Sequence, residues 1–201
     1  LQEKFSKKGL MILYTAPWPG QGFYTKFPVN SVSDFKGKKL RIYSTATQQM
    51  GSMLGFNATI LPFAEIPQAF STGLIEALFT SPQTGIDIQA WDNTKHFTYA
   101  GAIFSKNAVV VTKKAFNALS KGDQSNMLAA AKKAELRGWE MSAETTKKQI
   151  GILKKNGMSS KNAPDEVISK MKSIGLEMMK NWRSKASPEA NAVLDRYLSM
   201  R

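Results

Sequence analysis

Short apolar runs alternate with helical patterns along most of the chain. The runs predict strands at residues 10–15, 39–43, 58–61, 74–80, 97–104 and 108–112. The first run is unbroken and follows a helix-ending glycine, which is typical of a buried strand. Residues 108–112 are β-branched and uncharged, which predicts a central strand. Strands separated by helices every ~15–20 residues predict an α/β fold with a parallel sheet.

Helical periodicity and capping residues predict the helices. They lie at residues 47–54, 62–72, 115–119, 123–156, 164–184 and from 188 onward, with a short capped turn at 30–37. The long helix ends at Gly157 and would measure roughly 50 Å at ~1.5 Å per residue. That length exceeds a small lobe, so it predicts a helix that spans two lobes. Residues 16–28 hold three prolines and two glycines, which predict an irregular loop.

The start of the chain has the pattern of a helix end. Residues 1–9 close on Gly9, and no initiator methionine, secretion signal or N-cap precedes them. We therefore expect the chain to be a fragment that lacks an N-terminal portion and its signal peptide.

Composition narrows the class of protein. Of the 201 residues, 42% are hydrophobic and 21% are charged, as in a soluble globular protein. The absence of cysteine excludes disulfides, thiol nucleophiles and thiolate metal sites. A net charge of +13 favours an anionic partner, which could be a nucleic acid or a small organic acid.

Catalytic motifs are not visible. His96 is the only histidine and lies at a helix–strand junction, where a structural role is the common one. No nucleophile elbow, P-loop or histidine pair is present, so we expect no enzyme, no metal and no cofactor. A transferase or lyase that uses Arg41 and Asp92 stays a minor alternative without a tuned acid–base pair. Nucleic-acid binding is the runner-up, although the lysines are dispersed and no recognition motif appears.

Candidate ligand-binding side chains follow the predicted strands. Arg41 lies near the end of the strand at 39–43, and ligands of α/β sheets bind at the carboxyl ends of strands. Its planar guanidinium suits a carboxylate. Other strand ends and nearby loops carry further candidates, namely Phe63, Thr80, Ser81, Trp18, Tyr43 and Trp91. Such a set predicts a site for a small carboxylate with an apolar or aromatic body.

A spaced series of segments resembles a known family. The run V-S-D-F-K-G-K-K-L-R-I at 32–42 resembles the S-D-x-K-G-x-K-x-R segment of the solute-binding proteins of TRAP (tripartite ATP-independent periplasmic) transporters. Further segments that fit this family are P-F-A-E-I-P-Q-A at 62–69, T-G-L-I-E-A at 72–77, the stretch 80–91, A-E-L-R-G-W at 134–139 and L-K-K-N-G-M at 153–158.

The resemblance implies a periplasmic-binding-protein-like α/β fold with two lobes and a long lobe-spanning helix. Residues 1–29 and 104–156 would form a partial lobe one, and residues 30–103 and 157–201 would form lobe two. Roughly the first third of the mature protein would be absent. Arg41 would pair with the ligand carboxylate, Phe63 would pack on the ligand, and Thr80 or Ser81 would be a polar contact. Many members of the family carry a second arginine in the loop before this lobe, and Gln21 is its nearest equivalent in this chain.

The implied function is capture of a small organic acid in the periplasm and its delivery to the membrane subunits of a TRAP transporter. Trp18 and Trp91 would enclose the ligand together with Phe63. The missing second arginine and the aromatic loop favour a monocarboxylate. We expect a monomer that binds no nucleic acid.

Overall fold

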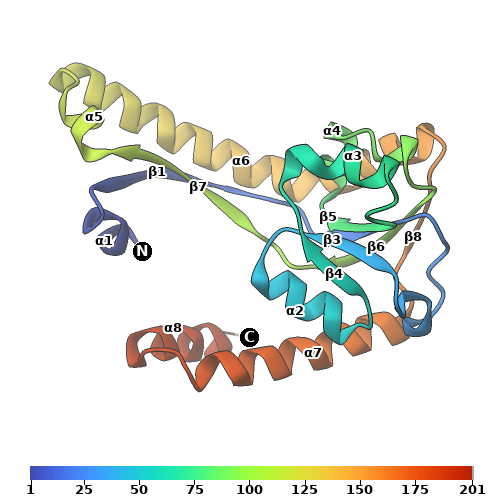
Figure 1. Ribbon diagram of the computed structural model, residues 1–201. Coiled ribbons are helices and arrows are strands. Elements are labelled where there is room, and N and C mark those ends of the chain that lie inside the picture. The colour runs from blue at the N-terminus through green and yellow to red at the C-terminus, as the bar shows by residue number, and fades with distance from the viewer. Residues whose placement is uncertain (201) are drawn as a thin grey trace. The chain divides into compact units, whose positions relative to one another are not determined.

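The computed structural model describes residues 1–200, apart from the side chain of Ala143, and divides the chain into two compact units. The first unit comprises Leu1–Phe27 and Leu78–Asn162, and the second comprises Pro28–Ala77 and the C-terminal segment from Ala163 (Figure 1). The bounds of the two units reflect how compactly the backbone packs within each unit. The lobe boundaries expected above stay a prediction.

One part of the first unit is a two-stranded ladder with a long helix. Strand β1 (Leu10–Pro17) pairs antiparallel with β7 (Lys106–Thr112), from Leu10 opposite Thr112 to Pro17 opposite Lys106. Helix α6 (Lys121–Lys155) runs beside β1 (Figure 1). The short helices α1 (Gln2–Ser6) and α5 (Lys113–Asn117) lie at the ends of the two strands.

Helix α6 confirms the predicted long helix. It has 35 residues, so its length is about 52 Å at 1.5 Å per residue. The Ser120 hydroxyl caps its first turn by accepting from the backbone N–H of Asp123 at 3.1 Å. Ala131, Gln149 and Leu153 are buried, and they lie on one stripe of the helix.

The other part of the first unit is a mixed sheet. Its strands are ordered β5 (Ala77–Thr80), β2 (Gln21–Thr25), β6 (His96–Ala102) and β8 (Ser159–Asn162). Strands β2 and β6 are antiparallel, whereas β6 and β8 are parallel. Helix α4 (Pro82–Asp87) and the 3₁₀ turn η3 (Ala90–Asp92) connect β5 to β6. The core contains two ring pairs, Phe23 with Phe79 at 4.8 Å and Tyr24 with Phe97 at 4.4 Å.

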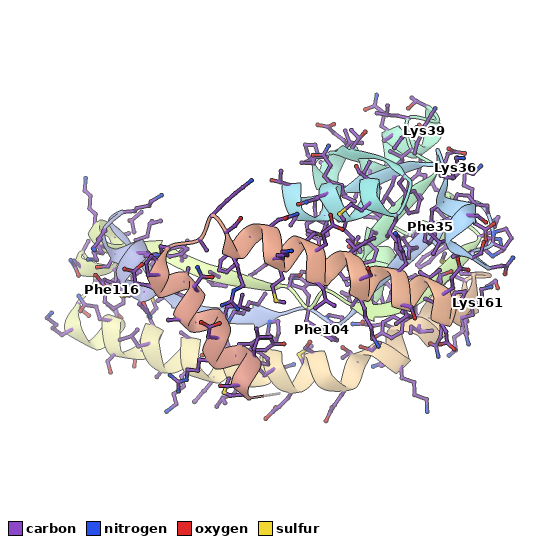
Figure 2. All side chains as sticks on the ribbon, turned by 90° about the horizontal axis from the view of Figure 1, so that it is seen from below. Phe35, Lys36, Lys39, Phe104, Phe116 and Lys161 are labelled. Carbon is purple, nitrogen blue, oxygen red and sulfur yellow. The ribbon has the colours of Figure 1, made fainter. Side chains whose placement is uncertain are left out.

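The second unit is built on a parallel pair of strands. Strand β3 (Lys39–Ile42) pairs with β4 (Asn57–Ile60) in parallel register, and α2 (Thr45–Met53) packs on both. The remaining elements are η1 (Val32–Phe35), η2 (Phe63–Glu65), α3 (Ile66–Ser71), α7 (Asp165–Arg183) and α8 (Pro188–Ser199). Phe35 stacks on Phe56 at 4.5 Å, and η1 lies against α7 (Figure 2).

Glycines with positive φ allow the turn that leads into β3. Gly37 (φ 72°) donates its N–H to the carbonyl of Gly55 (φ 98°) at 2.8 Å. Both residues end short helical segments, as the sequence predicted, because glycine adopts this conformation without steric cost.

Three expectations from the pattern were wrong. Within the described chain β7 is not central, because it pairs with β1 alone. The sheet that contains β2, β6 and β8 is mixed rather than parallel, and the β1–β7 ladder is antiparallel. The segment predicted to be an irregular loop contains the fully buried strand β2. Glycine in this segment had predicted a loop. In the structure Gly22 instead allows close packing within the strand, since a Cβ there would lie 2.9 Å from the Phe97 ring.

Among the described residues, no helix has both the length and the apolar character that a bilayer crossing requires.

One carboxylate links α6 to β1. Glu135 Oε1 accepts from the Thr15 backbone N–H at 3.0 Å and from the Thr15 hydroxyl at 2.7 Å. These hydrogen bonds favour the ionised form, so they lower the pKa of Glu135 below its ordinary value of 4.5. A lowered folded-state pKa stabilises the protein above the unfolded-state pKa, and this stabilisation is lost as the pH falls through the folded-state pKa.

Replacing Glu135 with glutamine should therefore lower stability at pH 7, and the difference between parent and variant should shrink as the pH falls through the folded-state pKa of Glu135. Urea unfolding at a series of pH values from 7 downward measures this difference. Glu140→Gln, at an exposed position of α6, is the matched control. Its difference in stability from the parent should not shrink as the pH falls. A parent–variant difference that is constant with pH would contradict the link.

Candidate functional site

The carboxyl edge of the β3–β4 pair gathers three of the predicted residues. In the parallel register, Ile42 lies opposite Ile60, so both strands end at the same edge. Arg41 and Tyr43 lie at the end of β3, and Phe63 opens η2 soon after the end of β4. The Leu61 N–H donates to the carbonyl of Ile42 at 3.3 Å and holds the two ends together.

Arg41 is a buried cation at this edge. Its side chain is 4% exposed, and its Nε donates to the carbonyl of Leu61 at 3.0 Å. The guanidinium carbon lies 6.0 Å from the centre of the Tyr43 ring. Burial lowers the pKa of Arg41 because it disfavours the charged form, while Tyr43 opposes this shift.

The terminal nitrogens of Arg41 have no protein partner in the described part of the chain. Nε is the only donor of this side chain that bonds to protein, and no carboxylate lies within 4 Å of the guanidinium. A buried charge is costly unless it is paired. The two NH₂ groups therefore form an open fork that a carboxylate could satisfy with two parallel hydrogen bonds.

The aromatic neighbours of Arg41 differ in exposure. Phe63 is 53% exposed, whereas Tyr43 is half-buried. An exposed phenyl ring close to the edge that carries a buried arginine offers an apolar surface for the body of a ligand. That these two residues contact a ligand stays a prediction.

In the first unit, Thr80 is the last residue of strand β5 and Ser81 follows it. The Ser81 hydroxyl caps helix α4, accepting from the Thr84 N–H at 3.2 Å and lying 3.0 Å from the Thr84 hydroxyl. The Thr80 side chain is 6% exposed, and its hydroxyl has no partner among the described residues. Of the two alternatives, Thr80 is therefore the one whose hydroxyl makes no hydrogen bond within the described chain.

Tyr24 positions this strand end, a role that sequence reasoning missed. Its buried hydroxyl lies 3.2 Å from the carbonyl of Ser81 and 3.4 Å from that of Pro82. The approach requires Gly85, because a Cβ there would overlap the Tyr24 hydroxyl. Burial, and then the charge of Asp87, raise the pKa of Tyr24. Only the pairing of β2 with β5 reveals this contact, since 61 positions separate the tyrosine from the glycine in the sequence.

Trp18 and Gln21 are both held by Ser105. The Trp18 N–H donates to the Ser105 carbonyl at 2.8 Å, and Gln21 Nε2 lies 3.5 Å from the Ser105 hydroxyl. Gln21 is 2% exposed at the start of β2. Trp91 is half-buried on η3 and lies far from Trp18 in the sequence. No contact between the two rings is found among the described residues.

Trp18 lines an open pocket of about 320 Å³, which we call the Trp18 pocket. Its lining residues are Ala16, Pro17, Trp18, Pro19, Gln83, Asn107, Gly138, Met141, Ser142, Thr145 and Gln149. The sequence gave no indication of this pocket, because four segments of the first unit contribute to it.

A metal site is not apparent in the described residues, where no three histidine, cysteine or acidic side chains gather.

Comparison with known proteins identifies similar chains. The family model of bacterial extracellular solute-binding protein family 7 matches residues 1–185. DctP7 of Bordetella pertussis, an extracytoplasmic solute receptor that binds pyroglutamic acid, is 38% identical with a TM-score of 0.93 over 98% of this chain. A TRAP solute-binding protein from a marine metagenome, specific for pyroglutamate, is 32% identical with a TM-score of 0.91 over 98% of this chain.

A solute-binding protein of Chromohalobacter salexigens is 25% identical over an alignment of 156 residues that covers 74% of this chain. The chain spans 65% of the length of each of the two solved structures and 46% of the Chromohalobacter protein. The high TM-scores confirm the predicted α/β, periplasmic-binding-protein-like fold class.

Because Tyr24 fills the space beside Gly85, Gly85→Ala should destabilise the chain by about 1–3 kcal/mol, the usual cost of overpacking. Urea unfolding measures this change. Gly151→Ala in α6 is the matched control, since its Cβ would meet no atom within 4 Å, and it should stabilise by about 0.5–1 kcal/mol. Equal effects of the two substitutions would contradict the proposed fit.

Proposed function

The chain belongs to the bacterial extracellular solute-binding protein family 7, and we propose that it captures a small organic acid for a TRAP-type secondary transporter. The observation that carries this proposal is Arg41, a buried arginine whose terminal nitrogens have no protein partner among the described residues. A carboxylate would satisfy both nitrogens and neutralise the charge.

The ligand class follows from the composition of this edge. One arginine and an exposed phenyl ring suit a monocarboxylate with an apolar or ring-shaped body. Relatives with 38% and 32% identity bind pyroglutamate, which is a monocarboxylate of this kind. Thr80, Trp18, Gln21 and Trp91 stay predicted contacts, with Thr80 favoured over Ser81 by its free hydroxyl.

Location and partners extend the same proposal. The family is extracellular by its description, and one relative is a TRAP solute-binding protein. We infer a periplasmic protein that acts as a monomer and passes its ligand to the membrane subunits of the transporter without chemical change.

Arg41→Lys should weaken binding of the cognate monocarboxylate by roughly 30-fold or more, about 2–5 kcal/mol, because an ammonium cannot form the two parallel hydrogen bonds. Isothermal titration calorimetry with a panel of monocarboxylates, pyroglutamate included, measures this loss. The titration should use protein that includes any residues that precede Leu1 in the natural protein.

Arg196→Lys serves as the control, because Arg196 lies exposed on α8 and has no ion-pair partner among the described residues. It should leave affinity unchanged. Thermal unfolding of Arg41→Lys separates loss of binding from loss of folding. Parent-like affinity of a folded Arg41→Lys protein would refute the assignment of the site.

The net charge of +13 favours one alternative, binding to nucleic acid. Binding of that kind weakens steeply as the salt concentration rises. Lysine and arginine side chains that contact phosphates release bound counterions, and added salt makes this release less favourable. Titration of duplex and single-stranded DNA at two salt concentrations therefore distinguishes the two functions.

A further inference from the structure

We propose that the Trp18 pocket is a second binding site of this chain, for a small neutral molecule that carries an N–H or O–H donor. None of the eleven lining residues is charged, although 21% of the chain is. Arg41 is not among them. An uncharged lining gives no compensation for a desolvated carboxylate, so this pocket differs in chemistry from the proposed anion site.

A chain of side-chain amides sets the polarity of the pocket wall. Gln83 Nε2 donates to Asp87 Oδ1 at 2.7 Å, because a carboxylate can only accept. This leaves the Gln83 carbonyl to accept from Gln149 Nε2 at 3.0 Å. This assigns Nε2 of Gln149 as the donor end of its amide and leaves its Oε1 as the acceptor of the three side chains without a partner.

That acceptor is buried and has no hydrogen-bond partner among the described residues. Gln149 is 7% exposed and lines the pocket. Buried polar atoms in native proteins are nearly always paired, so an unpaired one beside a pocket indicates a missing donor. Oε1 is covered in this structure, so a bound donor would reach it only after the Gln149 amide turns toward the pocket.

The remaining wall supplies both polar and apolar surface. The Asn107 amide and the Ser142 hydroxyl have no partner in the described chain, whereas the Thr145 hydroxyl already donates to the Met141 carbonyl at 2.6 Å. Trp18 and Met141 provide apolar surface. A cyclic amide matches this combination, since it has a flat apolar ring, one N–H donor and one carbonyl acceptor.

The test uses 2-pyrrolidinone, a neutral cyclic amide, and N-methyl-2-pyrrolidinone, which has the same ring without the donor. Each is titrated into the ¹⁵N-labelled chain, and the indole N–H resonance of Trp18 is followed after its assignment with Trp18→Phe. We expect a saturable shift with 2-pyrrolidinone and at least tenfold weaker binding of the N-methyl compound.

Gln149→Met keeps the volume of the side chain and removes the acceptor, so it should abolish the preference for the N–H compound. Gln49→Met, at an exposed position of α2, is the matched control and should keep that preference. Absence of a saturable Trp18 shift overturns the proposal, and so does equal binding of the two probes by the parent chain. The comparison of probes on the parent chain remains decisive if Gln149→Met fails to fold.

Discussion

The second unit contains a buried arginine whose charge is not neutralised by any carboxylate of the described chain. Arg41 lies 4% exposed at the end of β3, and a single backbone carbonyl is its hydrogen-bond acceptor. An unpaired buried cation raises the free energy of the folded state. The fold tolerates this cost because the parallel strands β3 and β4 and the cap of α2 fix the backbone on both sides of Arg41. The unsatisfied donors are then available to a ligand anion.

Hydrogen bonds between distant segments maintain the surroundings of the predicted contacts in the first unit. Tyr24 holds the junction of β5 and α4, and it can do so because Gly85 has no side chain. Glu135 ties α6 to Thr15 of β1. Ser105 holds the Trp18 backbone and approaches Gln21. Each of these contacts joins residues far apart in the sequence, so the geometry of the predicted contacts depends on the tertiary structure around them.

The two ligand chemistries inferred for this chain follow from opposite kinds of unpaired group. At the edge of β3 and β4 the unpaired groups are donors that carry a positive charge, which calls for an anion. In the Trp18 pocket the unpaired group is a neutral acceptor among uncharged neighbours, which calls for a neutral donor.

The sequence by itself determined most of the helices, although not α4, together with the glycine-ended turns, the position of Arg41 at a strand end and the family resemblance, because all of these depend on local pattern. It could not place Gln21–Thr25 in a strand, since glycine and proline there resemble a loop until Phe97 is seen to pack on Gly22. It also could not choose between Thr80 and Ser81, which are adjacent and chemically alike. Tertiary structure separates the two hydroxyls, because that of Ser81 accepts from the Thr84 N–H in the cap of α4 while that of Thr80 has no partner among the described residues. Which of the two contacts a ligand stays a prediction. Hydrogen-bond partners are set by three-dimensional proximity, which local pattern does not contain.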